Sequence, residues 1–122
     1  MEKAIAQIED INEASIYITC RGVTQRIPIK DILFLESENN KVKIALAKTK
    51  EKINVYTKLD KFEETLLSKT FIRAHKSFLV NFLYIDKYEN DRFELQDGTV
   101  IPISRTNKDK VKEAFYTLLN NQ

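Results

Sequence analysis

The spacing of apolar residues along the chain predicts a series of short β-strands. A period of two, typical of half-buried strands, begins at Ser15 and returns repeatedly up to Ser104. Turn-forming residues separate these segments, and the Asp97-Gly98 pair is the strongest of the turn signals. The predicted strands are residues 15–20, 23–29, 32–37, 42–47, 52–57, 82–89, 90–96 and 99–104.

In two segments the spacing of apolar residues changes from the period of two to the period of an α-helix. The first has apolar residues at positions 59, 62, 66 and 67, with Thr57 placed to cap it. The second follows Asn107, a residue type that caps helices, and has its apolar face at positions 111, 114, 115, 118 and 119. Residues 1–14 also carry apolar residues at helix-like spacing, which predicts a short helix or a linker. The predicted fold is therefore mainly β, with one internal and one C-terminal helix.

The bulk composition fits one soluble globular domain. The chain has 122 residues, of which 43% are hydrophobic and 31% charged. No apolar run approaches the roughly 20 residues of a membrane helix. The lone Cys20 cannot form an internal disulfide, which favours a reducing, cytoplasmic location.

The charge balance bears on the class of partner. The net charge is only +2, so nucleic-acid binding requires positive charge concentrated on one surface. Acidic residues gather at positions 60, 63 and 64 and again at 89, 91 and 94, which we expect to lie away from the basic clusters.

Enzymatic and cofactor chemistry is disfavoured. Two glycines are too few for a Walker loop or a dinucleotide fingerprint. Cys20 and His75 are the only residues of their types and fall on different predicted strands, which argues against a nucleophilic pair and gives a poor zinc ligand set. We therefore expect no enzyme activity, no cofactor and no metal.

Three polar clusters remain as candidates for binding. In an extended segment 73–77, Arg73, His75 and Ser77 would share one side of the strand. The other two clusters lie at the turn "ENNK" (38–41) and in "ISRTNK" (103–108). Arginine and lysine pair with guanine, asparagine pairs with adenine, and hydroxyls bind phosphates, although such clusters are more often solvated surface.

The stretch "FIRAHKSFLVN" (71–81) resembles the hallmark of the LytTR DNA-binding domain, Phe-x-Arg-x-His-Arg/Lys-Ser-Phe/Tyr-x-Val-Asn. Three further stretches resemble parts of this family in the same order. They are "IPIKDILFLESENNKVKI" for its early strand and polar turn, "YTKLDKFEETL" for its internal helix, and "LQDGTVIPISR" for its late hairpin. The resemblance covers about residues 15–119.

The resemblance implies a ten-stranded fold of small packed antiparallel sheets in residues 15–122, with 1–14 as linker or short helix. Family members are bacterial transcription regulators that insert loops into successive major grooves of DNA. Lys76 and Arg105 are implied to make base or close phosphate contacts, while Asn81 satisfies backbone groups. The full set of positions implied to face or support DNA contact is Asn40, Lys41, Arg73, His75, Lys76, Ser77, Arg105, Asn107 and Lys108. Within it, Arg73, His75 and Ser77 are implied to hold the loop or contact the DNA backbone.

Two departures from the family pattern leave alternatives open. The early turn reads "NNKV", without the aromatic residue that usually follows its asparagine. Members usually carry an upstream receiver domain, so this chain is expected to be either an excised effector domain of a two-component response regulator or a stand-alone regulator. We expect sequence-specific binding to promoter DNA as paired copies, a homodimer on direct repeats. The alternative is a protein-interaction module, an anti-activator that pairs with a related regulator through residues 1–14 or a sheet edge.

Overall fold

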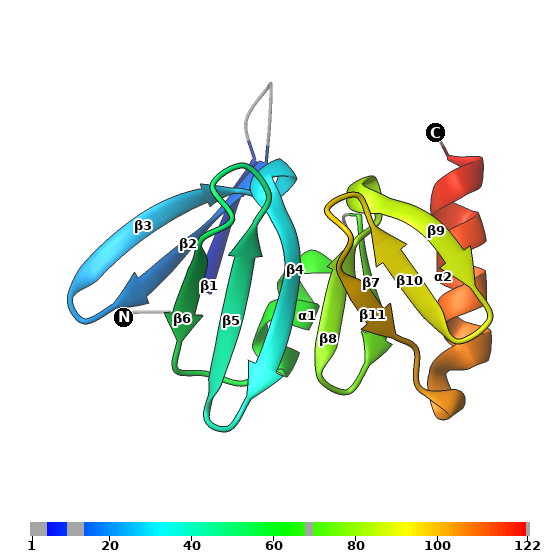
Figure 1. Ribbon diagram of the computed structural model, residues 1–122. Helices are drawn as coiled ribbons and strands as arrows, with labels where there is room; N and C mark the ends of the chain where they lie inside the picture. The colour runs from blue at the N-terminus through cyan, green and yellow to red at the C-terminus, as the bar shows by residue number, and fades with distance from the viewer. Residues whose placement is uncertain (1–4, 10–13, 68–69, 122) are drawn as a thin grey trace.

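Figure 1 shows the computed structural model, which describes residues 5–9, 14–67 and 70–121. Within these residues the chain forms eleven strands in three antiparallel sheets, and two α-helices. The strands are β1 (Ile5–Glu9), β2 (Ala14–Cys20), β3 (Val23–Pro28), β4 (Ile32–Glu38), β5 (Lys41–Leu46), β6 (Lys52–Val55), β7 (Phe71–His75), β8 (Phe78–Asn81), β9 (Ile85–Glu89), β10 (Arg92–Leu95) and β11 (Val100–Pro102). The helices are α1 (Leu59–Leu66) and α2 (Lys108–Asn120).

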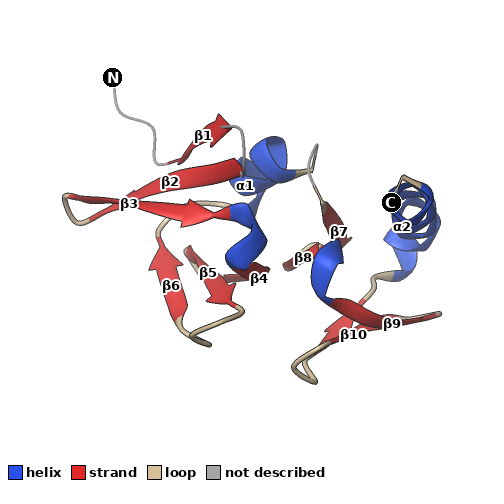
Figure 2. Cartoon of the chain, turned by 90° about the horizontal axis from the view of Figure 1, so that it is seen from above, coloured by secondary structure: helices blue, strands red, loops and turns tan. Residues whose placement is uncertain are grey.

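The central five-stranded sheet, in the order β6-β5-β4-β8-β7, is buried on both faces. Neighbouring residues of one strand enter different cores: Leu79 packs with β2 and α1, while Val80 packs with β10 and α2. Figure 2 shows α1 with sheet β1-β2-β3 on one side, and α2 with β9 and β10 on the other. Burial on both faces explains why residues 32–35 read as a continuous apolar run instead of alternating.

The N-terminal segment differs from the predicted helix. Residues 5–9 form β1, which pairs antiparallel with β2 in a register that places Ile5 opposite Ile18. A helix this short is marginal without tertiary packing, whereas the edge of β2 offers a full ladder of backbone hydrogen bonds. The described residues therefore form eleven strands, one more than the ten implied by the resemblance. The remaining positions of the predicted helix, 1–4 and 10–13, lie outside the described residues.

Of the two predicted helix caps, Thr57 is wrong, and Asn107 is correct in position only. Helix α1 begins at Leu59, so Thr57 stands one residue before its N-cap, Lys58, and caps nothing. Asn107 occupies the N-cap position of α2, but its side chain makes no capping hydrogen bond. A short 3₁₀ turn at Arg105–Asn107 precedes α2, and the Lys108 backbone N–H donates to the Arg105 carbonyl there. The turn thus satisfies the N–H of the first residue of α2, whereas an N-cap side chain would accept from the second or third residue.

The predicted strand at 82–89 is also shorter than expected. A 3₁₀ turn occupies Phe82–Tyr84, and β9 starts at Ile85. Asn81 determines this turn, because its side chain accepts a hydrogen bond from the backbone N–H of Leu83 at 3.1 Å. The mainly β class, the internal helix and the C-terminal helix agree with the prediction.

Candidate nucleic-acid interface

The three polar clusters found in the sequence lie at one end of the molecule. Figure 1 shows the β4–β5 turn, the β7–β8 turn and the segment before α2 at the lower end of the fold. Backbone hydrogen bonds join them: Ser37 N donates to the Ser77 carbonyl at 2.8 Å, and Ser104 N donates to the Ala74 carbonyl at 3.0 Å. The β7–β8 turn is thus tied to the elements on either side of it.

The hallmark segment is a hairpin, which corrects the expected extended run 73–77. Strand β7 ends at His75, the chain turns at Lys76 and Ser77, and β8 begins at Phe78. The pairing register shifts between Arg73 and His75, so a β-bulge breaks the alternation of faces. Arg73, His75 and Ser77 therefore do not form a single exposed row. The turn projects Lys76 into solvent at the end of the hairpin.

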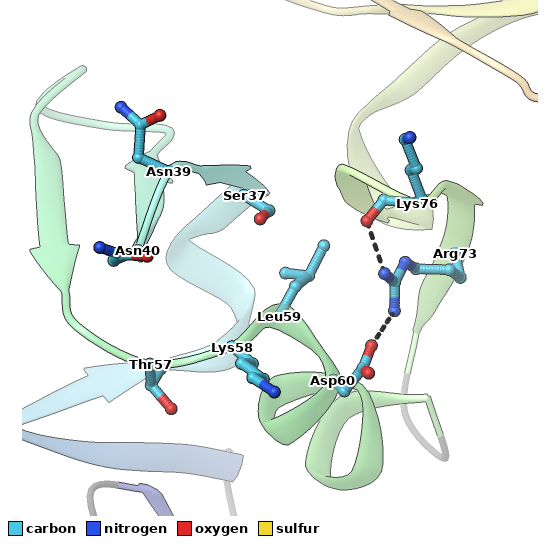
Figure 3. Close-up of a pocket in the computed structure, with 9 residues that line it drawn as sticks. All are labelled: Ser37, Asn39, Asn40, Thr57, Lys58, Leu59, Asp60, Arg73 and Lys76. Atoms are coloured by element: carbon cyan, nitrogen blue, oxygen red, sulfur yellow. Dashed lines mark hydrogen bonds and ion pairs between the residues drawn. The ribbon is translucent and has the colours of Figure 1, made fainter.

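Arg73 is engaged within the protein through most of its N–H groups. Its Nε donates to the His75 carbonyl at 2.8 Å, and its Nη2 donates to the Lys76 carbonyl at 2.6 Å. Its Nη1 pairs with Asp60 Oδ1 at 3.1 Å and also with Glu63 Oε1. Figure 3 shows the guanidinium between Asp60 and the Lys76 carbonyl. The expected separation of the first acidic group from the basic cluster is therefore wrong, because the fold brings α1 against β7.

His75 and Asn81 also support the hairpin. The His75 ring accepts the Ser77 backbone N–H at its Nδ1, at 3.1 Å, and packs edge-on to Phe78. Asn81 is fully buried. Its Nδ2 donates to the Ile32 carbonyl at 2.8 Å, and its Oδ1 accepts the Thr70 hydroxyl at 2.9 Å. The expectation that Asn81 satisfies neighbouring backbone groups is confirmed.

The β4–β5 turn presents two adjacent amides. Asn39 adopts a left-handed backbone conformation with φ 57°, which asparagine tolerates better than most residues, and Asn40 is exposed beside it. Lys41 is half-buried at the start of β5. Nearby, Lys43 Nζ lies 2.5 Å from Glu38 Oε1, and this hydrogen bond and charge lower the pKa of the Glu38 carboxyl. Lys43 is therefore paired and adds little free positive charge here.

An open groove of about 500 Å³ separates the β4–β5 turn from the β7–β8 turn. Figure 3 shows its walls, which carry amide, hydroxyl and ammonium groups. The lining residues are Ser37, Asn39, Asn40, Thr57, Lys58, Leu59, Asp60, Arg73 and Lys76. Thr57 and Lys58 fall in the stretch that resembles the internal helix of the family, but sequence reasoning did not identify them as binding residues. Only the packing of α1 beneath the two turns places them here.

The third polar segment, just before α2, has side chains with few polar contacts inside the protein. Arg105 and Thr106 are exposed, while Asn107 and Lys108 are half-buried. Within the described part of the chain, the Arg105 side chain has no ion pair or hydrogen bond, and the only polar contact of Thr106 is a 3.5 Å hydroxyl contact with Ser104. Arg105 is thus available to a ligand, in contrast to Arg73.

The comparison with known families identifies the domain. Residues 22–116 match the family model of the LytTr DNA-binding domain. The chain belongs to the LytTR family of DNA-binding domains. This confirms the resemblance, supports DNA binding in transcription regulation, and is consistent with the expectation that the chain is not an enzyme.

Two relatives agree with this assignment of the LytTR domain. The chain is 30% identical to "Sensory transduction protein LytT" of Bacillus subtilis (strain 168) over 127 residues, which cover 95% of this chain and 51% of that protein. The chain therefore spans about half the length of this curated relative. A solved LytTr DNA-binding domain from Bacillus cereus superimposes with a TM-score of 0.62 at 21% identity, covering 97% of this chain and 98% of that one. This likeness confirms the predicted fold.

The described residues of this LytTR domain include neither a metal-binding cluster nor a membrane-spanning helix. Residues 5–9, 14–67 and 70–121 contain no group of three or more His, Cys, Asp or Glu side chains that could hold a metal ion. The Cys20 thiol contacts the Asn54 carbonyl at 3.6 Å, far along the chain from His75. No helix among these residues is long and apolar enough to cross a membrane.

Proposed function

We propose that this LytTR domain binds double-stranded promoter DNA in a sequence-specific manner and so regulates transcription. The observation that carries the proposal is that three separate segments with polar residues lie side by side along one end of the fold. Turns that project from a rigid sheet can enter the major groove, where each base pair presents a distinct pattern of donors and acceptors. Segments placed side by side can contact neighbouring stretches of one DNA face.

The side chains of these segments divide into two groups. Arg105 and Lys76 are exposed and unpaired among the described residues, so we assign them base-edge or close phosphate contacts. Asn40 is exposed at the β4–β5 turn and has the amide that adenine recognition requires. We assign phosphate contacts to the half-buried Lys41 and Lys108, together with Asn107. Arg73, His75 and Ser77 then support the turn instead of reaching DNA.

The groove between the two turns extends this footprint. Thr57 and Lys58 line the groove across from Lys76, together with the carboxylate of Asp60. A DNA strand that crosses from one turn to the other would carry its phosphates past these groups. We therefore assign Lys58 and Thr57 to the phosphate backbone, where they add affinity without sequence information.

We further propose that the domain acts as the DNA-binding part of a response regulator or as a stand-alone regulator. The name of the Bacillus subtilis relative refers to sensory transduction, and that protein is about twice as long as the matched segment. Two copies on direct DNA repeats would double the contact area. The repeats, the pairing of copies and an upstream receiver domain are all parts of the proposal.

The experiment that tests the proposal is a footprint of the purified chain on the DNA upstream of its own gene, with random-sequence DNA as competitor. We expect a protected site, or two sites in direct repeat, that survive the competitor. Protection that random DNA abolishes would contradict sequence-specific binding. No binding at low salt, together with co-purification of a related regulator, would favour the protein-interaction module.

The salt dependence of binding tests the groove. Each lost phosphate contact reduces the slope of log affinity against log salt by about 0.9. We expect this reduction for Lys58→Gln. Lys50→Gln is the matched control, because Lys50 is exposed in the β5–β6 turn, at the opposite end of β5 from the interface. Equal slopes for the two variants would remove Lys58 from the interface.

A further inference from the structure

The acidic residues of α1 lie in an unexpected place for a protein that binds polyanions. Asp60 and Glu63 both bond the guanidinium of Arg73, directly beneath the β7–β8 turn. Asp60 also lines the groove between the two turns. Two carboxylates at this position repel phosphate, so their presence calls for a role that outweighs the repulsion.

Arg73 connects these carboxylates to the backbone of the turn. Its remaining donors bind the carbonyls of His75 and Lys76, the last residue of β7 and the first residue of the turn. The planar guanidinium has donors in a fixed fork, so groups held on opposite sides of it are held relative to one another. The orientation of the Lys76 peptide is thereby linked to the position of α1.

Helix α1 is a firm support for such a link. Its buried residues Leu59, Phe62 and Leu66 belong to the larger hydrophobic core. The Arg73 side chain is 17% exposed and that of Glu63 is 30% exposed, so this pair is better shielded from solvent than an ordinary surface ion pair. Asp60, at 77% exposure, is the weaker partner.

We propose that Asp60 and Glu63 are positioning residues of the DNA interface: through Arg73 they hold the β7–β8 turn in the conformation that presents Lys76. The inference rests on the proposed function for its meaning, but its structural part concerns the free protein alone. We call the arrangement of Asp60, Glu63 and Arg73 the clamp. The β-bulge in β7 explains the need for it, because the bulge interrupts the ladder of backbone hydrogen bonds just before the turn.

A positioning role and simple repulsion predict opposite changes in DNA affinity when Asp60 and Glu63 are neutralised. If Asp60 and Glu63 only repel phosphate, neutralising them strengthens binding to every DNA sequence. If they position the turn, neutralising them weakens specific binding relative to random DNA. The helix supplies a matched control: Glu64 is exposed and makes no ion pair or hydrogen bond with the described residues.

The experiment compares the double variant Asp60→Asn/Glu63→Gln with Glu64→Gln, and adds Arg73→Lys, which keeps the charge but loses the fork. The double variant keeps the acceptor oxygens but removes their charges, and Arg73→Lys removes the forked donors. We expect each to reduce the ratio of specific to random DNA affinity roughly tenfold, because a charge-assisted hydrogen bond is about twice as strong as a neutral one. Glu64→Gln leaves that ratio unchanged. Thermal unfolding of each variant checks that the domain still folds.

Amide hydrogen exchange in the free protein gives a readout independent of DNA. The Ser77 N–H is hydrogen bonded to the His75 ring inside the turn. We expect its exchange to be several-fold faster in the double variant and in Arg73→Lys than in the wild type or Glu64→Gln. Unchanged exchange, or a double variant that gains affinity in parallel with Glu64→Gln, would overturn the clamp. If the wild type bound no specific DNA, the proposed function would fail, while faster exchange would still support the clamp.

Discussion

The β7–β8 turn and the segment before α2 stand at the same end of the domain but use their polar side chains in different ways. In the turn, Arg73 and His75 bond groups of the protein itself. In the segment before α2, Arg105 extends from a 3₁₀ turn without such bonds among the described residues. Two arginines of similar appearance in the sequence therefore have different roles: Arg73 stabilises the β7–β8 turn, whereas no described residue engages the donors of the Arg105 side chain, which are free for a ligand.

This contrast has a physical basis. A hairpin turn beyond a bulge has few backbone hydrogen bonds of its own, so side chains must order it. The segment before α2 is ordered by backbone bonds at both ends, from Ser104 N to the Ala74 carbonyl and from Lys108 N to the Arg105 carbonyl. Its side chains are consequently free for binding. Substitutions in the two regions should separate stability from DNA affinity.

The largest effect is expected for Asn81→Ala, at the base of the hairpin. The substitution leaves the buried carbonyl of Ile32 and the hydroxyl of Thr70 without their partners, so the free energy of unfolding should fall by about 3 kcal/mol. Urea denaturation measures this change. A loss below about 1 kcal/mol would mean that water replaces the side chain and that the hairpin depends less on Asn81 than its burial indicates.

Arg105→Ala should affect DNA binding and leave stability intact. The free energy of specific binding should fall by about 1–3 kcal/mol if Arg105 reads a base, and discrimination should relax at one position of the site. Titration of the wild type and the variant against single-base changes of the footprinted site measures both. An equal loss on all sequences would make Arg105 a phosphate contact, and no loss would remove it from the interface.

Lys76→Ala should have a smaller effect, seen in the salt dependence of DNA binding. The turn uses the Lys76 carbonyl, not its ammonium group, so the substitution should not disturb the bonds from Arg73. If Lys76 contacts a phosphate, the salt slope of binding should decrease by about 0.9 while the melting temperature stays constant. A lower melting temperature would show that the lysine side chain itself stabilises the hairpin.

The smallest effect is expected for Asn107→Ala. It makes the same substitution as Asn81→Ala, but at a side chain without buried partners among the described residues. The Asn107 side chain makes no capping hydrogen bond, so the free energy of unfolding should change by less than about 0.5 kcal/mol. Urea denaturation provides the test. A loss of about 1 kcal/mol, the usual value of an N-cap, would indicate that the side chain caps α2 in solution.

The sequence predicts most of the fold because the patterns are local. Strands β2–β6 and both helices fall where period and turn residues place them, since alternate side chains of a strand must face one core. Residues 32–35 do not alternate between apolar and polar types, because both faces of the central sheet are buried there. The sequence also separates the three polar segments and carries the family hallmark.

Only the tertiary structure decided how these segments combine. The bulge after Arg73 changes which way its side chain points, and no periodic pattern reveals a single inserted residue. The pairing of Arg73 with α1, the strand at residues 5–9 and the position of Lys58 in the groove all depend on contacts between elements distant in sequence or joined by packing. The amino-acid pattern identified the polar segments that we propose as the DNA interface. The packing of α1 against the hairpin determined which of them are already engaged, because a side chain bonded within the protein must give up that bond before it can contact anything else.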